Sequence, residues 1–410
     1  PDPTTFESRT MTVPTTTRLT RADCEAMDAA DPLGRFRAEF ALPEGVIYLD
    51  GNSLGPMPVR AAERVAAMMR DEWAEMLITG WNRAGWYAQP RRVGDRIARL
   101  IGAGTGEVVM GDTLSIKVFQ ALSAALTLNP GRRVILSDSG NFPSDLYVAE
   151  GLARTVGAEL RVVAPEAVAG AIDADLAVLM LTEVDYRTGR RHDMAALTAQ
   201  ARAAGALTVW DLAHSAGAID VDLRGADADF AVGCTYKYLN GGPGAPAFAY
   251  VAARHHADLR QPIQGWMGAA DPFAMGADFA PAEGIRRMIS GTPPVLAMVP
   301  MRAMLDLVDD AGMPAIRAKS RALTAFAVEV ADELLAPYGV TVATPRDPER
   351  RGSHITLAHP AFRDLTARLW ERGVIPDFRP PDQLRIGLSP LSTSFAEVAL
   401  GLGAIAEELG

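Results

Sequence analysis

Lys237 lies in the stretch CTYKYLNGGPG, between two tyrosines and after an apolar run. A lysine amine forms imines with carbonyl groups when burial or a nearby cation lowers its pKa and frees its lone pair. The glycines and proline that follow favour a turn in which the backbone can approach a bulky ligand closely. A lysine at the end of a strand is usually only a solvated residue. This setting also suits covalent attachment of a carbonyl-bearing cofactor.

Asp211 and His214 precede Lys237 in the segment VWDLAHSAG. Asp211 ends an apolar run with the pattern of a strand. A carboxylate in that place can pair with a protonated pyridine nitrogen, so that the ring stays cationic and withdraws electrons. Together with Lys237 it indicates pyridoxal phosphate. His214 would hold the imine region or the phosphate side of this cofactor, although a lone histidine after a strand is more often structural.

Short β-rich runs alternate with helical patterns through the middle of the chain. We expect strands within residues 132–139, 159–164, 175–184, 206–214 and 228–237. Residues 193–204 predict a helix that Asp193 caps and Gly205 ends. This order indicates right-handed crossovers and a mainly parallel sheet, whose ligands bind where loops leave the carboxyl ends of the strands. Asp211 and Lys237 are both expected at that edge.

The organisation changes at about residue 301, where long amphipathic helices precede short strands, as in a separate α+β domain. We therefore expect an α/β fold with a large helix-flanked domain over residues 61–300 and a small α+β domain over 301–410. Residues 11–60 are expected to be an N-terminal segment that packs with the small domain. The polar residues 1–10 are interpreted as an extension.

The composition favours a soluble globular protein that binds small molecules rather than nucleic acid. With 49% hydrophobic and 22% charged residues the chain has a globular composition, and its net charge of −10 gives no general basic surface for nucleic acid. No apolar run is long enough to predict a membrane span. The two cysteines, Cys24 and Cys234, predict no disulfide framework and no cysteine-rich metal site, which fits a cytoplasmic location.

Several segments together resemble one enzyme family. DLAHSAG followed by CTYKYLNGGPGAPAF is similar to the fold-type I pyridoxal phosphate enzymes of the class V aminotransferase group. The segments YLDGNSLGPMP, SGNFPSDLY and IQGWMGAADPFAM narrow the resemblance to the kynureninase family, and LRIGLSPLSTS extends it to residues 45–395. Each piece alone is weak, whereas the combination is specific. The resemblance implies a large domain with a mainly parallel, seven-stranded type of sheet.

The resemblance also implies a set of residues around the cofactor. Lys237 would bond to it covalently, Asp211 would pair with the pyridine nitrogen and Phe142 would stack on the ring. Leu114 and Ser115 would hold the phosphate where a helix begins, which is a ready anion site. The complete implied set is Leu114, Ser115, Phe142, Asp145, Asp211, His214, Tyr236, Lys237, Trp266 and Thr292. The family often has asparagine in place of Thr292. Without the resemblance, Phe142 and Trp266 would be core aromatics and Ser115 a helix cap.

Substrate-binding residues follow from the same resemblance. Arg385 would bind an α-carboxylate with its fork-shaped guanidinium, and Trp81 would lie near the substrate's aromatic ring. Asn52 and Ser53 would shape the same pocket. Without the resemblance, Arg385 would be read as a solvated arginine on an edge strand. Trp81 would then pack against a neighbouring helix, and GNSLG would form a simple turn.

The implied reaction is hydrolysis of L-kynurenine to anthranilate and L-alanine in a homodimer with active sites at the subunit boundary. Lys237 and Tyr236 would move protons, with Asp211 as the third catalytic residue. If Trp81 lies beside the ring, we expect L-kynurenine to be preferred to 3-hydroxykynurenine, because an apolar pocket leaves the extra hydroxyl without a partner.

Three alternative functions each require residues or segments that can be looked for in the sequence. A cysteine desulfurase or selenocysteine lyase needs a mobile cysteine late in the chain, and the last cysteine here is Cys234. A dinucleotide-binding protein needs GxGxxG after the first strand, whereas NGGPGAP follows a late one. A non-catalytic cofactor-binding regulator would bring an effector or DNA-binding module, for which the chain has no spare segment.

Overall fold

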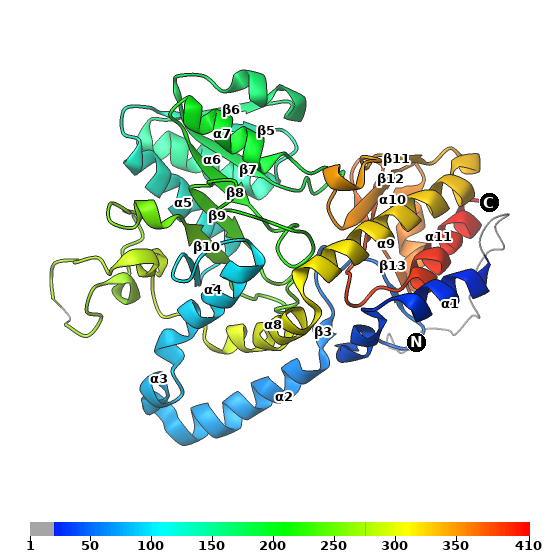
Figure 1. Cartoon of the computed structure of the whole chain (residues 1–410), viewed down its shortest axis with the longest axis horizontal. Coiled ribbons are helices and arrows are strands. Elements are labelled where there is room, and N and C mark those ends of the chain that lie inside the picture. Colours follow the sequence, from blue (N-terminus) through cyan, green and yellow to red (C-terminus); the bar gives the residue numbers. More distant parts are fainter. Residues whose placement is uncertain (1–19, 275) are drawn as a thin grey trace.

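A seven-stranded sheet and a four-stranded sheet form two bodies that lie side by side (Figure 1). The structure is a computed structural model, and it describes residues 20–274 and 276–410. The extension expected at residues 1–10 lies outside the described part.

The large sheet has the strand order β4-β10-β9-β8-β7-β5-β6. Strands β5 to β9 are parallel, and β10 is antiparallel to both of its neighbours. The strands are β4 (Val108–Met110), β5 (Val134–Asp138), β6 (Glu159–Val163), β7 (Leu176–Thr182), β8 (Leu207–Asp211), β9 (Phe230–Gly233) and β10 (Phe248–Val251). The expected strands and the mainly parallel sheet are therefore confirmed, with β10 as an antiparallel insertion.

Helices cover both faces of this sheet, so its central strands are buried throughout. On one face α5 (Leu114–Leu128) packs against β7, β8 and β9, and α6 (Pro143–Val156) packs against β5 and β6. On the other, α7 (Met194–Ala203) packs against β7 and β8, and α4 (Gln89–Leu100) packs against β4 and is itself contacted by α8 (Val299–Ala311). All seven residues of β7 are buried, as expected for a strand covered on two sides.

The predicted helix α7 begins and ends where the sequence indicates. The Asp193 side chain accepts a hydrogen bond from the Ala196 amide at 3.0 Å, which satisfies a free N–H of the first turn. Gly205 has φ +81°, a left-handed conformation that glycine adopts without a steric penalty. The helix therefore stops before β8, which leads to Asp211.

The second body is an antiparallel sheet of order β11-β12-β15-β14 with helices on it. Its elements are α9 (Met313–Leu334), β11 (Thr341–Val342), β12 (His354–Ala358), α10 (Phe362–Glu371), β14 (Asp377–Arg379), β15 (Gln383–Gly387) and α11 (Phe395–Leu409). N-terminal residues join it: α1 (Arg21–Ala30) contacts α11, and β2 (Ile47–Tyr48) pairs with β13 (Val374–Ile375). The domain limits expected from the sequence stay a prediction.

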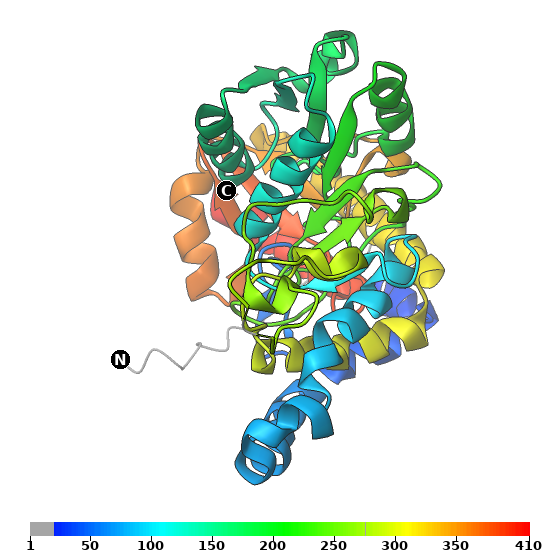
Figure 2. The same cartoon turned by 90° about the vertical axis from the view of Figure 1, so that its left-hand side faces the viewer.

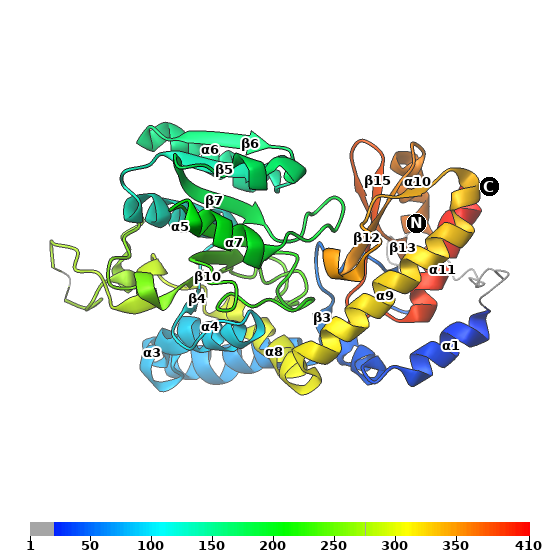
Figure 3. The same ribbon diagram turned by 45° about the horizontal axis from the view of Figure 1, so that its top comes forward.

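A hairpin after β7, residues 184–191, connects the two bodies. The Thr344 hydroxyl donates to the Thr188 carbonyl at 2.7 Å, and the Gly352 amide donates to the Gly189 carbonyl at 2.8 Å. The carboxyl ends of the parallel strands face the small sheet (Figure 3). The loops that follow β7, β8 and β9 therefore meet the small body, which is where the sequence places the ligand.

A helical arm projects from the large body (Figure 2). It contains α2 (Val59–Ala67), a π-helical segment (Met68–Ala74) and α3 (Gly80–Arg83). Large apolar side chains are exposed on and beside this arm: Met57, Val59, Met69, Trp73, Leu77 and Ile78. Among the described residues, no helix combines the length and the apolar character needed to cross a membrane.

Candidate cofactor and substrate site

Lys237 lies in the loop after β9, and its amine meets His214 from the loop after β8. The Lys237 Nζ to His214 Nε2 distance is 3.2 Å. Burial and the charge of Lys237 hold the pKa of His214 well below its usual value, so the imidazole is neutral and accepts from the amine. In the described part of the chain Lys237 forms no ion pair, whereas Lys117 and Lys319 pair with Asp112 and Asp31.

Two buried carboxyl groups, Asp145 and Asp211, lie together next to this lysine. Asp145 is in the first turn of α6 and Asp211 ends β8; their exposed fractions are 1% and 3%. Burial raises the pKa of both, and the charge of Asp211 raises that of Asp145 further, while Lys237 acts in the opposite direction. Asp145 Oδ2 has no hydrogen-bond partner among the described residues. The two carboxyl groups interact by a side-chain hydrogen bond, and the pair keeps an oxygen free to accept from a ligand.

Phe142 ends the loop before α6 and faces the same space. The Lys237 Nζ lies 5.8 Å from the centre of its ring, and Tyr186 meets the ring edge-on at 5.2 Å. Thr182, which the sequence analysis missed, lies opposite Asp211 in the sheet and interacts with its carboxylate. A flat ring placed against Phe142 would have Asp145 and Asp211 within reach.

The start of α5 is the expected phosphate site. Thr113 caps the helix, and Leu114 and Ser115 are its first two residues. The Ser115 hydroxyl lies 3.0 Å from the Ser144 hydroxyl at the start of α6, so two helix N-termini meet there. Free amides at helix starts bind anions.

Tyr236 precedes Lys237 and keeps its proton. Burial is the main cause that raises the pKa of Tyr236 above its ordinary value, and Cys234 raises it further. The Lys237 Nζ lies 6.0 Å from the centre of the ring. Tyr236 is therefore placed to donate a proton rather than to remove one.

Arg385 is buried on β15, with 1% of its surface exposed. Its Nε donates to Asp377 Oδ2 at 2.8 Å, its Nη2 donates to the Ser53 hydroxyl at 2.7 Å, and its Nη1 donates to the Tyr186 carbonyl at 3.0 Å. Nη2 also pairs with Asp377. The expected proximity of Ser53 and Arg385 is thus seen, and Asp377 is a partner that the sequence analysis missed.

His354 is a third residue that the sequence analysis did not identify. It begins β12, has no exposed surface, and its ring lies 5.6 Å from the His214 ring, centre to centre. A histidine in a short strand pattern is indistinguishable in sequence from a core residue. Asn52 interacts with His214 through its backbone.

Three expected site residues lie away from this centre. Trp81 is on α3 in the arm and meets Trp86 edge-on at 5.9 Å. Trp266 is 38% exposed and contacts Phe273, and Thr292 is exposed. Among the described residues, no hydrogen bond or ring contact joins any of the three to Lys237, Asp211 or Arg385. Their roles stay predictions.

The residues at the centre fit pyridoxal phosphate. Lys237 offers an unpaired amine, and the acid pair has an unpartnered buried oxygen where a protonated ring nitrogen would be stabilised. The meeting helix starts suit a phosphate. In the described residues, no cluster of three or more His, Cys, Asp or Glu side chains could hold a metal ion.

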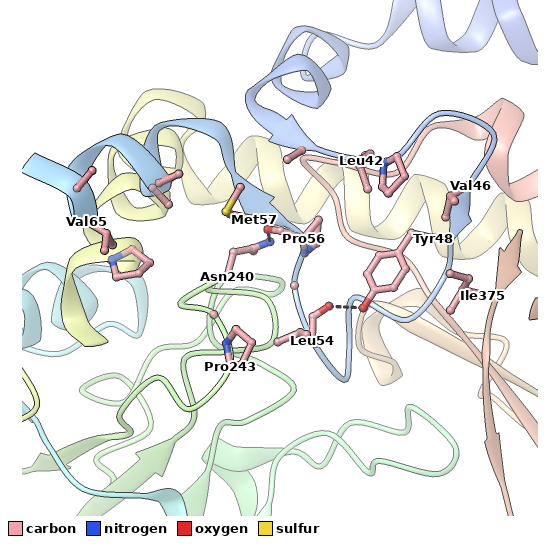
Figure 4. Close-up of a pocket in the computed structure, with 18 of the residues that line it drawn as sticks. Leu42, Val46, Tyr48, Leu54, Pro56, Met57, Val65, Asn240, Pro243 and Ile375 are labelled. Carbon is pink, nitrogen blue, oxygen red and sulfur yellow. Dashed lines mark hydrogen bonds between the residues drawn. The ribbon is translucent and has the colours of Figure 1, made fainter. Parts of the chain in front are cut away.

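A separate apolar cavity of about 740 Å³ is lined in part by Asn240 and Pro243 (Figure 4). Its only polar side chains are Tyr48 and Asn240, which donate to the carbonyls of Leu54 and Pro56 at 2.7 Å each. It has no charged side chain for a phosphate or a carboxylate. We therefore assign the ligand to the Lys237 site.

Comparisons with known proteins agree with the resemblance. Residues 316–404 match the family model described as the kynureninase C-terminal domain. The chain is 50% identical over 386 residues to a kynureninase of Pseudomonas fluorescens, and this match covers 92% of this chain and 93% of the relative. It is 49% identical over 400 residues to a kynureninase of Deinococcus radiodurans, with coverages of 95% and 97%.

A solved structure shows the same fold at low identity. The apo structure of a cysteine desulfurase from Thermococcus onnurineus NA1 matches with a TM-score of 0.76 and 20% identity, over 91% of this chain and 97% of that one. This likeness confirms the expected fold class.

The acid pair generates a prediction for the cofactor-free protein. Folding raises the pKa of Asp211 to about 6, so the folded protein binds a proton at this carboxyl more tightly than the unfolded chain does. The contribution of this proton to the free energy of unfolding is complete below pH 4 and is lost as the pH rises through about 6. Asp211→Asn should therefore melt at a higher temperature than the wild type at pH 8, and this difference should disappear towards pH 4. Thermal melts from pH 4 to 8 measure it. The exposed control Asp175→Asn should follow the wild type. Equal or lower stability of Asp211→Asn at pH 8 would contradict the prediction.

Proposed function

The chain belongs to the kynureninase family, and we propose that it hydrolyses L-kynurenine, and 3-hydroxykynurenine less well, with pyridoxal phosphate as its cofactor. The products are anthranilate and L-alanine, and water is the second reactant. The observation that carries the proposal is the Lys237 amine, which contacts His214 and lies beside a buried acid pair, while the charges of Lys237 and of the buried Arg385 both act on His214 and His354. Such a site takes an amino acid by its carboxylate and its amine.

The cofactor would be held by residues that the structure gathers around Lys237. Asp211 and Asp145 would bind the ring nitrogen, Phe142 would stack on the ring, and Ser115 with Leu114 would hold the phosphate. Bound pyridoxal phosphate supplies an electron sink for negative charge that develops at the substrate α-carbon. Trp266 and Thr292 are proposed to complete the phosphate site from a second copy of the chain.

Lys237 and Tyr236 are proposed to move protons. The Lys237 amine would bond to the carbonyl group of the cofactor and, when free, would act as the base that removes the α-proton. The neutral His214 ring orients this amine through its Nε2 atom. Tyr236 keeps its proton because burial raises its pKa, so it can donate to the substrate as the β,γ bond breaks.

A cysteine desulfurase activity is disfavoured by the position of the cysteines. Both Cys24 and Cys234 are buried and unbridged. Burial raises the pKa of Cys234, which keeps the thiol protonated and weakly nucleophilic. The same two free thiols support our proposal of a cytoplasmic location.

We also propose a homodimer whose arms complete the active sites. In one chain, α3 with Trp81 lies far from both β8 and β12 (Figure 1). The arm exposes apolar side chains, with Ile78 77% and Leu77 65% exposed, which suits burial against a partner. A second copy would bring Trp81 to the substrate ring and so favour L-kynurenine over its hydroxylated relative.

The role of Lys237 can be tested by removing its amine. Lys237→Ala should lower anthranilate production at least about 1000-fold without changing the melting temperature of the cofactor-free protein, because the imine-forming amine and the base are lost together. Lys237→Arg keeps the charge and should be equally inactive. After borohydride reduction, mass spectrometry should find the cofactor on the Lys237 peptide of the wild type. Full activity of either variant would contradict the assignment.

The dimer can be tested on the arm. The wild type should have the mass of a dimer by light scattering, and Ile78→Asp should shift it towards the monomer and reduce kcat, because a charge would be buried in the interface. Val162→Asp is the matched control, since Val162 is 43% exposed on the edge strand β6 and far from the arm along the sheet. A fully active monomer would refute the shared site.

A further inference from the structure

The Arg385 guanidinium has few donors left for a substrate. Its five N–H groups make four hydrogen bonds, two to Asp377 and one each to Ser53 and the Tyr186 carbonyl. The edge formed by Nε and Nη2, which would give a bidentate grip, faces Asp377. Arg385 can therefore attract an α-carboxylate by its charge, but it cannot satisfy both carboxylate oxygens by itself.

Asp377 also weakens this charge. Its Oδ2 accepts from Arg379 as well as from Arg385, and the three side chains form one partly buried network. A carboxylate that approaches Arg385 meets the negative Asp377 on one side. Tight binding then requires further neutral donors on the open side.

His354 lies on that side with unused hydrogen-bonding groups. It has no exposed surface, and neither of its ring nitrogens has a hydrogen-bond partner among the described residues. Burying a polar group without a partner is unfavourable, so such a group is expected to meet a ligand. The Tyr186 backbone, whose carbonyl accepts from Arg385, also interacts with the His354 ring.

The register of the small sheet places His354 beside Arg385. Across β12 and β15, His354 is opposite Gly387 and Thr356 is opposite Arg385. Residues two apart in a strand share a face, so His354 and Arg385 point to the same side of the sheet. His354 also contacts His214, the partner of the Lys237 amine. It therefore lies between the carboxylate-binding cation and the reacting amine.

Asn52 provides a second set of unused groups at the same place. Its amide oxygen and nitrogen are both buried without a partner in the described residues. A side chain at Gly387 would lie 2.0 Å from Asn52 Oδ1, so the glycine makes room for this amide next to His354.

We propose that His354 is a substrate-binding residue that, with Asn52, completes the α-carboxylate subsite at Arg385. Arg385 supplies the charge, and the His354 ring and the Asn52 amide each donate a hydrogen bond to the carboxylate. Burial, Arg385 and Lys237 lower the pKa of His354 to about 3, so the ring stays neutral and keeps one N–H donor. This inference rests on the proposed function, because it assumes an amino acid substrate.

Ligand binding to the holoenzyme tests the inference. The cofactor absorption is titrated with L-alanine and with L-alaninamide, which lacks the carboxylate charge. His354→Leu should weaken L-alanine binding about 10- to 100-fold and leave L-alaninamide binding unchanged, because a hydrogen bond to a charged group is lost. His354→Gln retains a donor and should stay within about 3-fold of the wild type. The matched control His359→Gln, in the same segment but outside the site, should bind both ligands normally.

Unchanged L-alanine binding in His354→Leu, or an equal loss for both ligands, would overturn the inference. If His354→Leu does not fold, ¹⁵N NMR of the wild type replaces it. The His354 ring nitrogens, assigned by their loss in His354→Gln, should shift with L-alanine and not with L-alaninamide, and an absent shift would overturn the inference. Wild-type turnover of L-kynurenine is measured in parallel. If it occurs, a negative binding result rejects only the role of His354; if it does not, the proposed function fails.

Discussion

Two carboxyl groups are buried together where the parallel strands of the large sheet end, and the arrangement of the site depends on how their charge is compensated. Asp211 ends β8 and Asp145 begins α6, so the fold itself brings them together. Burying such a pair is costly unless it is compensated. Lys237 lies nearby without forming an ion pair among the described residues, which leaves the acid pair for a cationic ring and the amine for covalent chemistry.

The site is shared between the two bodies of the chain. The loops after the parallel strands supply His214, Tyr236 and Lys237, while the small sheet supplies Arg385 and His354. The hairpin over residues 184–191 is hydrogen-bonded to the small body and carries Tyr186, which contacts both Phe142 and Arg385. This hairpin therefore ties the position of the carboxylate subsite to the position of the ring site.

Local patterns predicted much of the fold but little of the small body's contribution to the site. The strands before Asp211 and Lys237 and the cap at Asp193 follow from short-range periodicity and cap chemistry, which sequence displays directly. The Arg385–Asp377 pair and the orphaned His354 depend on antiparallel register between distant segments. In the sequence, His354 cannot be distinguished from the other residues of a short strand. The resemblance supplied Phe142, Asp145 and Arg385, which no local rule would have selected.

The most direct measurement is titration of the cofactor-free protein with pyridoxal phosphate, followed by addition of L-kynurenine. The acid pair and Lys237 predict one bound cofactor per chain, a new visible absorption band from its bond to the lysine, and release of anthranilate and L-alanine in equal amounts. Anthranilate fluorescence and amino acid analysis give the two products. A protein that binds the cofactor but releases no anthranilate would contradict the account, as would turnover that does not depend on the cofactor.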